Sequence, residues 1–546
     1  MNQLEATAMS PVVLPPAWVR FAGWYAAGSG KWFRGPCNLF IRVAARQSTF
    51  DKAPVGVGVK RKRDAADTEV ASDVQYSTSI ENDSLKIPSA AATATVKDHG
   101  SAGYKEQQQE QIPKNDSYYR NLYRHEIDFR EMGTQDPDFK AVLKRNGQLD
   151  FSDPKAVMQL TKSSLKLHFG LEMELPDDRL CPPVPNRHNY ILWLKDLLDS
   201  SSYCPPGGKL TGLDIGTGAS CIYPLLGCTQ RPWEFIATDV DKKSLSYAEK
   251  NIAANNLSDR IKLVPRPDSA TSPLIPLDEL EIDAIDFVMT NPPFYESEKE
   301  LLTLAAQKEL PPSTACTGAP VEMVHPAGGE VGFVTRILDE SLVLRERVRW
   351  YTSMLGKLSS LEVLVETLRD RGVTNYAVTE FVQGTKTKRW AVGWSFGGMR
   401  AGQAAARGMA QLAWRKVLPA PVEVEIGALG VSKAGEVAGN IDALMHGLEL
   451  ESWGWDKQEL KGVARTRENV WGRAWRRRKA REKDGVGEAS VGAAERDKPL
   501  SGFEVAMAVG RSQAVVVCRW REGHDEAIFQ SFCGFLKTRL ELGVAT

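Results

Sequence analysis

The chain has 546 residues, and its 69 Lys and Arg residues balance 69 Asp and Glu residues, so the formal net charge is zero. A chain of this length exceeds one comfortable core, and we expect two folded domains plus flexible segments. The neutral balance excludes a global attraction to nucleic acid, so any RNA affinity must come from local basic patches. No apolar run approaches the ~20 residues that span a bilayer, so we expect a soluble protein.

The eight cysteines are scattered and include no C-x-x-C pair. This spacing argues against a zinc site and against a disulfide framework, so we expect no metal and a reducing compartment.

Residues 1–114 have the composition of a disordered extension, because a polar, Ala/Ser/Thr-rich stretch cannot bury enough apolar surface to fold. Residues 1–50 resemble an organelle transit peptide, with an incorrect gene start as the alternative. The basic cluster at residues 60–63 is typical of a nuclear import signal. These two signals conflict, and we expect a nuclear protein, with cytoplasm and mitochondrion as alternatives.

Residues 115–200 are expected to form an N-terminal helical module. Asp153, followed by a proline, is a plausible N-cap for one helix. A second helix begins near residue 185, where apolar residues recur at helical spacing. Arg187 lies at its start, where a guanidinium can pair with a carboxylate in a bidentate manner.

Residues 201–400 begin with a strand that ends at Asp214 and Ile215 and runs into a glycine turn. Gly216 and Gly218 let the backbone approach a ligand closely, and a helix begins near Ser220. The turn is not a full G-x-G-x-x-G, so a pyrophosphate is less favoured. Acid-x-Gly-x-Gly instead matches the loop that holds the amino-acid part of S-adenosylmethionine (SAM).

A second strand ends at Asp239, where an acidic side chain would bind the ribose hydroxyls of the cofactor. A third apolar strand ends in the run Asn291, Pro292, Pro293 and Phe294. Each proline fixes its own φ and lacks an N–H donor, so the Asn291 amide and the Pro292 carbonyl are held in fixed directions. These two oxygens could accept both hydrogens of an exocyclic amine whose ring stacks on Phe294.

We expect the long segment 295–325 to form a mobile lid, since loops of that length in compact domains are usually functional or disordered. The sheet then finishes with a helix and a strand pair whose last strand is antiparallel. The hairpin that joins this pair carries Lys386, Lys388 and Arg389 on the side where a substrate must arrive.

Residues 401–417 are rich in Ala and Gly and are expected to form a linker. We expect residues 418–546 to form a C-terminal α/β domain. Its basic helix, expected over residues 467–483, carries Arg476, Arg477 and Arg478 beside tryptophans, a composition that suits contact with a phosphate backbone.

Three segments resemble the methyltransferase-like protein 16 family: GLDIGTGASCIYPLLG at 212–227, the Asn-Pro-Pro-Phe run, and VQG with KRWA near 382–391. Members are adenine-N6 methyltransferases of U6 small nuclear RNA or of bacterial ribosomal RNA. The resemblance implies a Rossmann-like class I SAM-dependent fold, an α/β fold with a seven-stranded mixed sheet. It further implies that Arg187 contacts the cofactor carboxylate and that Thr271, or a neighbour in a lengthened loop, contacts the cofactor. Ser220 and Asn291 are expected to contact the cofactor as well.

The same resemblance implies an RNA groove in the helical module, with Arg120 and Arg124 as candidate phosphate contacts, and an RNA contact by Arg389 beside the active site. The expected activity is SAM-dependent N6-methylation of an unpaired adenine in U6 or a similar structured RNA by a monomer. Three alternatives stay open: a ribosomal RNA methyltransferase, a protein glutamine methyltransferase, and a non-catalytic RNA-binding protein.

Overall fold

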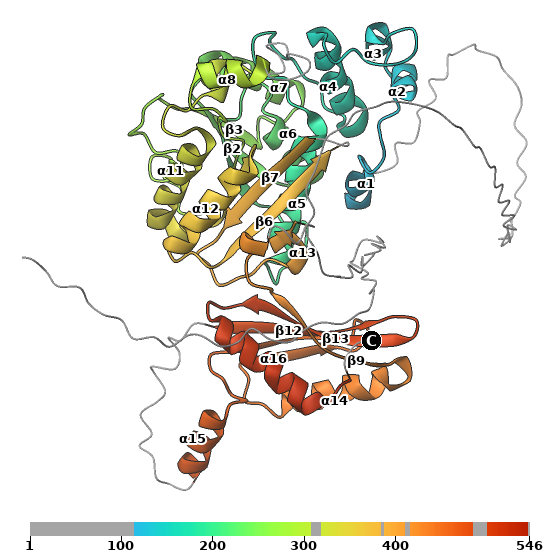
Figure 1. Ribbon diagram of the computed structural model, residues 1–546, viewed down its shortest axis with the longest axis vertical. Helices are drawn as coiled ribbons and strands as arrows, with labels where there is room; N and C mark the ends of the chain where they lie inside the picture. The colour runs from blue at the N-terminus through green and yellow to red at the C-terminus, as the bar shows by residue number, and fades with distance from the viewer. Residues whose placement is uncertain (1–113, 307–317, 384–386, 410–414, 484–499, 544–546) are drawn as a thin grey trace, which may run out of the picture. The chain divides into compact units, whose positions relative to one another are not determined.

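The computed structural model describes residues 114–306, 318–383, 387–409, 415–483 and 500–543 (Figure 1). The expectations for the N-terminal extension, which concern residues 1–50 and the basic cluster at 60–63, lie outside these described residues. They therefore stay predictions.

The N-terminal module consists of five helices, three of which begin at an acidic N-cap. Asp128, Asp136 and Asp153 each accept a hydrogen bond from a backbone N–H in the first turn of the helix that follows. The predicted cap at Asp153 is thereby confirmed. The helices are α1 (Asp116–Asn121), α2 (Phe129–Gln135), α3 (Pro137–Val142), α4 (Pro154–Phe169) and α5 (Val184–Ser200).

The following segment builds a mixed sheet with the strand order β3-β2-β1-β4-β5-β7-β6-β8. β7 runs antiparallel to both of its neighbours, β5 and β6, as the sequence predicts for the last strand. The predicted seven-stranded class I sheet is confirmed, and the two-residue β8 is added at its edge. The strands are β1 (Thr211–Ile215), β2 (Glu234–Asp239), β3 (Ile261–Pro265), β4 (Ile285–Thr290), β5 (Val348–Leu355), β6 (Tyr376–Gln383), β7 (Thr387–Trp394) and β8 (Arg407–Gly408).

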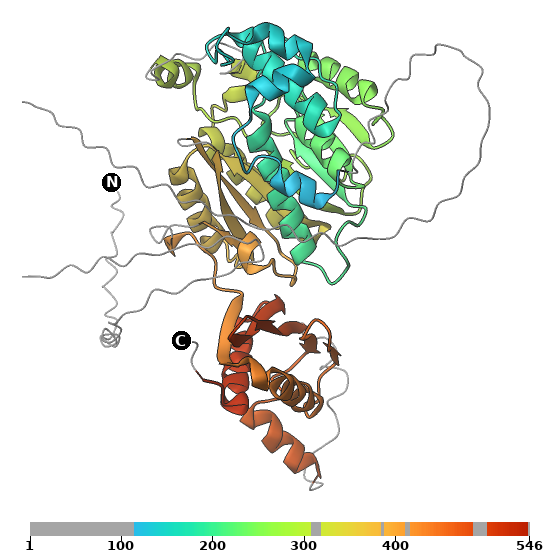
Figure 2. The same ribbon diagram turned by 90° about the vertical axis from the view of Figure 1, so that its right-hand side faces the viewer.

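Helices cover both faces of this sheet (Figures 1 and 2). One apolar cluster joins Phe287 of β4 to α5, α6 (Ile222–Gln230) and α7 (Lys242–Ala254). The next residue, Val288, belongs to a second cluster with α11 (Gly329–Leu344) and α12 (Leu358–Asp370). Successive side chains of a strand point to opposite faces, so a strand buried on both sides needs a near-continuous apolar run. β4 has such an apolar run. The polar residues Thr290 and Asn291 at its end are therefore easy to recognise in the sequence.

Two further helices follow β4: α8 (Glu298–Ala306) and the short α10 (Pro320–Met323). The 3-10 turn η1 (Arg345–Arg347) connects α11 to β5.

The first part of the predicted linker, residues 401–417, packs against the mixed sheet and belongs to the same core. It forms α13 (Gln403–Ala406) and β8. Ala405 and Ala406 are buried, and the Trp193 indole N–H donates to the Ala405 carbonyl at 2.9 Å. Small side chains let this segment approach the sheet closely, so the composition that suggested flexibility here serves close packing.

The C-terminal domain is a five-stranded antiparallel sheet of order β10-β11-β12-β13-β9, with α14 and α16 packed into its core. The hairpin β10–β11 was not predicted, and the basic helix begins at Arg473 because Val470 and Trp471 are buried in the core before it. The elements are β9 (Glu423–Gly430), η3 (Val431–Lys433), α14 (Ala434–His446), β10 (Ser452–Asp456), β11 (Lys461–Thr466), α15 (Arg473–Lys483), β12 (Ser501–Val509), β13 (Gln513–Glu522) and α16 (Glu526–Leu540).

Candidate active site

The glycine turn after β1 has a backbone that only glycine adopts easily. Gly216 and Gly218 have φ angles of 73° and 65°. The N–H groups of Gly216 and Thr217 both donate to the Thr238 carbonyl at 2.9 Å, and the Gly218 N–H donates to Asp239 Oδ2 at 2.8 Å. The turn is thus fastened to the end of β2, and a Cβ added at Gly216 would meet nothing within 4 Å. This open backbone faces a ligand site.

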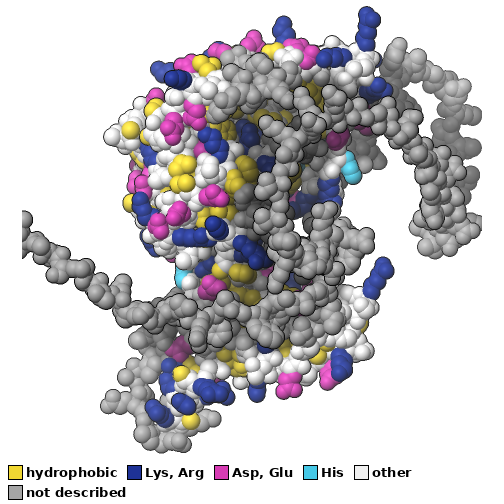
Figure 3. All heavy atoms as spheres, in the orientation of Figure 1, with side chains coloured by type: hydrophobic (Ala, Val, Ile, Leu, Met, Phe, Trp, Pro, Cys, Tyr) yellow, Lys and Arg dark blue, Asp and Glu magenta, His cyan; other side chains and the backbone are white. Residues whose placement is uncertain are grey.

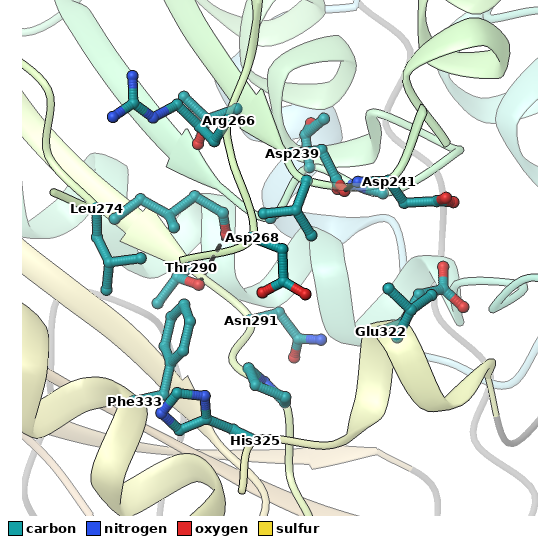
Figure 4. A pocket seen from close by; sticks show the side chains of 18 of the residues that line it. Asp239, Asp241, Arg266, Asp268, Leu274, Thr290, Asn291, Glu322, His325 and Phe333 are labelled. Atoms are coloured by element: carbon teal, nitrogen blue, oxygen red, sulfur yellow. Dashed lines mark hydrogen bonds between the residues drawn. The ribbon is translucent and has the colours of Figure 1, made fainter. Parts of the chain in front are cut away.

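A cavity of about 420 Å³ lies over this turn (Figure 4). Gly216, Gly218, Ser220, Asp239 and Arg187 all line it, as does Asn291 from the end of β4. β1 and β4 are parallel neighbours, with Ile215 opposite Thr290, so their carboxyl ends meet at this cavity. Open backbone, an acid after β2 and a buried cation fit the amino acid and ribose of SAM.

The two predicted acids differ in their places. Asp239 lines the cavity, and burial raises its pKa although the N–H groups of Gly218 and Asp241 oppose that effect. Asp214 is fully buried beneath the turn and does not line the cavity, and its burial raises its pKa to about 7.

Arg187 lies in the first turn of α5 and is almost fully buried. Its Nη1 donates to Asn291 Oδ1 at 3.0 Å and to the Met354 sulfur at 3.3 Å, and its guanidinium stands 5.6 Å from the centre of the Tyr223 ring. Because the described residues give this cation no carboxylate partner, it is available to an acidic group of a ligand.

The Asn-Pro-Pro-Phe corner lies between this cavity and a second one. Asn291 and Pro293 line the cofactor cavity, whereas Phe294 lines a groove of about 1250 Å³ on the other side. Thr290 supports the corner, because its hydroxyl donates to the Ile215 carbonyl at 2.8 Å. Of the four predicted catalytic residues, Asn291 and Pro293 thus face the cofactor cavity and Phe294 faces the groove, whereas Pro292 is buried and its side chain lines neither.

The Phe294 ring rests on a glycine that a buried acid holds in place. Glu330 accepts hydrogen bonds from the Gly356 N–H at 2.7 Å and the Lys357 N–H at 3.1 Å. It therefore caps the N-terminus of α12 rather than that of its own helix α11. A Cβ at Gly356 would lie 2.8 Å from the Phe294 ring, so only glycine leaves the ring room.

The groove beyond Phe294 is lined by the helical module on one side and the end of the sheet on the other. Arg124 and Phe151 line it, and Phe151 is 60% exposed. Arg389 lines it too, with its guanidinium 5.9 Å from the centre of the Phe294 ring. A groove with aromatic rings and cations suits a single-stranded nucleic acid.

The predicted RNA contacts have different surroundings. Arg120 pairs with Asp196 at 2.5 Å and Lys388 pairs with Glu380 at 2.8 Å, so both stabilise the fold itself. Lys386 lies outside the described residues. Arg478 of α15 pairs with Glu468, whereas Arg476 and Arg477 are exposed.

Several cavity residues were missed by sequence reasoning. Thr271 is exposed and does not line the cavity, whereas Asp268, Ser269, Ala270 and Ser272 of the same loop do. Figure 4 shows Asp268 pointing toward Asn291 and His325 lying beside Phe333. Glu322, Val324 and His325 come from the predicted lid and also line the cavity. The length of the 295–325 segment was the one sequence feature that indicated functional residues there.

The described residues contain neither a membrane-spanning helix nor a metal-binding cluster. No helix there combines the length and apolar character that a membrane crossing requires. Likewise, that part of the chain holds no cluster of three His, Cys, Asp or Glu side chains able to bind a metal ion.

Comparison with known proteins identifies the chain's relatives. Residues 113–398 match a family described as RNA methyltransferase. A protein of Schizosaccharomyces pombe named U6 small nuclear RNA (adenine-(43)-N(6))-methyltransferase is 37% identical over 396 residues, which cover 72% of this chain and 96% of that protein. Human RNA N(6)-adenosine-methyltransferase METTL16 is 45% identical over 287 residues, so the match spans about half of each protein (51% and 50%).

Solved structures include the human METTL16 catalytic domain in complex with a hairpin of the MAT2A 3′UTR. It is 44% identical, covers 51% of this chain and 94% of that chain, and has a TM-score of 0.45. The assignment rests on the sequence matches and on the site described above. The chain therefore belongs to this RNA methyltransferase family, with SAM as its methyl donor.

Proposed function

We propose that this protein methylates the N6 amine of an unpaired adenine in a structured RNA, with U6 small nuclear RNA as the leading substrate. The observation that carries the proposal is the place of the Asn291–Phe294 corner, between a cofactor-sized cavity and an open groove. The names of the fission yeast and human relatives support adenine N6 as the acceptor, and the name of the yeast protein supports U6.

The corner supplies positioning and electrostatics for the transfer. Asn291 Oδ1 and the Pro292 carbonyl accept the two amine hydrogens, while Phe294 stacks the adenine ring. This draws the nitrogen lone pair out of conjugation with the ring. Bound SAM supplies an electrophilic methyl group on its sulfonium. The N–C bond forms as the C–S bond breaks, and the alkylated amine then loses one proton to solvent, so no strong general base is required.

Arg187 fixes the direction of the Asn291 amide. A guanidinium has only donors, so the amide must turn its oxygen toward Arg187. A carboxamide oxygen has two lone pairs, and the 3.0 Å bond to Arg187 uses one of them. The other remains for the target amine. The cofactor carboxylate, once paired with Arg187, also offsets a positive charge beside a nitrogen that becomes cationic.

The RNA must present its target as an unpaired base. A base inside a duplex cannot reach Phe294, so it has to leave its stack and enter the groove. Arg124 is exposed in that groove and Arg389 stands over Phe294. We assign them to the phosphate backbone near the flipped base.

The C-terminal domain contributes a second RNA surface in this proposal. Figure 3 shows Lys and Arg side chains gathered over α15. Arg478 and Trp475 stack, with the guanidinium 4.3 Å from the ring centre, which leaves the exposed Arg476 and Arg477 for phosphates. We further propose that the protein is monomeric and nuclear; size-exclusion chromatography with light scattering and imaging of a fluorescent fusion test these two points.

The test of function compares wild type with Asn291→Ala on a U6 transcript and on the same transcript with the target adenine base-paired. Wild type is expected to form N6-methyladenosine on the first RNA only, as measured by nucleoside mass spectrometry. Asn291→Ala should lower the rate by about 10²–10³-fold while RNA affinity is retained. A wild type that is inactive on every RNA would instead indicate a binding protein. Methylation of a glutamine peptide or of ribosomal RNA alone would identify a different substrate class.

A further inference from the structure

Glu322 is a half-buried acid in the cofactor cavity, and the methyl-transfer site described above does not use it. It lies in α10, within the part of the 295–325 segment that returns to the cavity (Figure 4). Its Oε2 accepts hydrogen bonds from the backbone N–H groups of Leu180 and Ala319, both at 2.9 Å. One carboxylate oxygen is therefore held by backbone N–H groups from two separate segments.

The other oxygen, Oε1, faces the glycine turn. It lies 3.9 Å from the position that a Cβ on Gly218 would occupy. Within the described part of the chain, Oε1 accepts no hydrogen bond. The neighbouring cation Arg179 is already paired with Asp241 at 2.9 Å and with Asp178 at 3.0 Å. A carboxyl group with one oxygen left over thus lines a ligand cavity.

Glu322 lies beside Gly218 of the glycine turn, the turn that the Acid-x-Gly-x-Gly pattern assigns to the amino-acid part of the cofactor. Leu180, which donates to Glu322, leads into α5, and that helix carries Arg187. The carboxylate and the ammonium group of the cofactor are bonded to the same carbon atom. A cofactor whose carboxylate pairs with Arg187 therefore places its ammonium group near Arg187 as well. A cation is also the partner from which a buried carboxylate gains most.

We propose that Glu322 Oε1 binds the ammonium group of the cofactor's amino-acid part, so that the returning segment supplies a cofactor-binding residue. This inference rests on the proposed function of the cavity as the SAM site.

The assignment links the cofactor to the catalytic corner. Met323, next to Glu322, accepts a hydrogen bond from the Tyr295 N–H at 3.0 Å, and the His325 N–H donates to the Tyr295 carbonyl at 2.8 Å. Tyr295 directly follows Phe294. A cofactor that holds Glu322 therefore also stabilises the backbone beside the adenine-stacking ring.

Glu322→Gln is a clean test, because the glutamine oxygen can still accept from Leu180 and Ala319 while its NH2 group replaces Oε1. The ligand is S-adenosylhomocysteine, and binding to the full chain is measured by calorimetry. We expect Glu322→Gln to weaken binding by roughly tenfold or more. Glu362→Gln, which changes an exposed acid of α12, is the matched control and should bind like wild type.

A second ligand separates the ammonium from the rest of the cofactor. The analogue 5′-S-(3-carboxypropyl)-5′-thioadenosine lacks only the amine, so wild type and Glu322→Gln should bind it equally. In wild type, S-adenosylhomocysteine should also slow hydrogen exchange of the His325 and Tyr295 amides, and this protection should be lost in Glu322→Gln.

Two results would overturn the assignment: unchanged S-adenosylhomocysteine affinity in Glu322→Gln, or an equal loss of affinity for both ligands, which would indicate a ribose contact or a structural role. A wild type that binds S-adenosylhomocysteine and methylates RNA while Glu322→Gln is unaffected refutes only this inference. A wild type that binds no S-adenosylhomocysteine refutes the proposed function instead.

Discussion

Gly356→Ala tests whether the seat of the Phe294 ring determines the reaction rate. The added Cβ would lie 2.8 Å from Phe294 Cδ1 and 3.3 Å from Glu330 Oε2. Carbon atoms in good contact lie about 3.5–4.0 Å apart, so the ring must move by about 0.7 Å or more. Gly356 does not have a positive φ, so alanine adds no backbone strain.

The ring moves toward the open groove, so stability should change little, while the adenine plane shifts relative to the cofactor. A misplacement of about 1 Å can lower a rate by ~10²-fold, and we expect kcat to fall by about 10–100-fold. Affinity for S-adenosylhomocysteine should not change. Single-turnover methylation and calorimetry measure the two quantities.

The control is Gly534→Ala on the exposed side of α16, where a Cβ meets nothing within 4 Å. It should retain full activity and gain about 0.5–1 kcal/mol of stability. A Gly356→Ala enzyme within twofold of wild type would refute the reasoning, and so would a parallel loss of cofactor affinity.

The remaining predictions concern stability and RNA binding. The folded pKa of Asp214, about 7, lies above its unfolded value, so the folded state keeps the proton to a higher pH than the unfolded state does. The ligand-free protein should therefore become less stable as pH rises from about 4 to about 7. The free energy of unfolding of Asp214→Asn, measured by chemical denaturation, should rise relative to that of wild type by up to about 4 kcal/mol across this pH range. A difference that stays constant with pH would contradict this. Glu330→Gln places an NH2 group against a backbone N–H and should lower the free energy of unfolding by about 1–3 kcal/mol, with faster hydrogen exchange at the start of α12. Normal stability would show that the cap is dispensable. Arg476→Glu with Arg477→Glu should weaken RNA binding and reduce its salt slope by about 2, because two phosphate contacts are lost; an unchanged slope would remove α15 from the RNA surface.

The sequence was most informative where structure depends on the local chain. The end of β4 combines an apolar run with two prolines, and the turn after β1 needs glycines with positive φ. Both requirements leave a visible pattern in one stretch. Because the carboxyl ends of parallel neighbouring strands meet at one edge, the placing of Asn291 near Gly216 also followed from the sequence.

The sequence could not show which charged side chains the fold itself uses. Arg120 and Lys388 look like free cations in the sequence, but their partners Asp196 and Glu380 become neighbours only after folding. The hairpin β10–β11 was missed for a related reason. Both strands are short, and β10 alternates exposed with half-buried residues while only β11 contains fully buried ones, so the apolar signal of each strand is weak in the sequence.

The coupling of the two cavities was equally hidden from the sequence. Arg187 lines both the cofactor cavity and the groove, and the same guanidinium holds Asn291. Sequence reasoning assigned Arg187 to the cofactor and Asn291 to both the amine and the cofactor, but it predicted no contact between these residues, which lie 104 positions apart. The bond between them means that the cofactor carboxylate and the target amine act on neighbouring groups. A ligand bound in one cavity therefore affects the geometry of the other through Arg187 and Asn291. Separate sequence motifs could not predict this coupling.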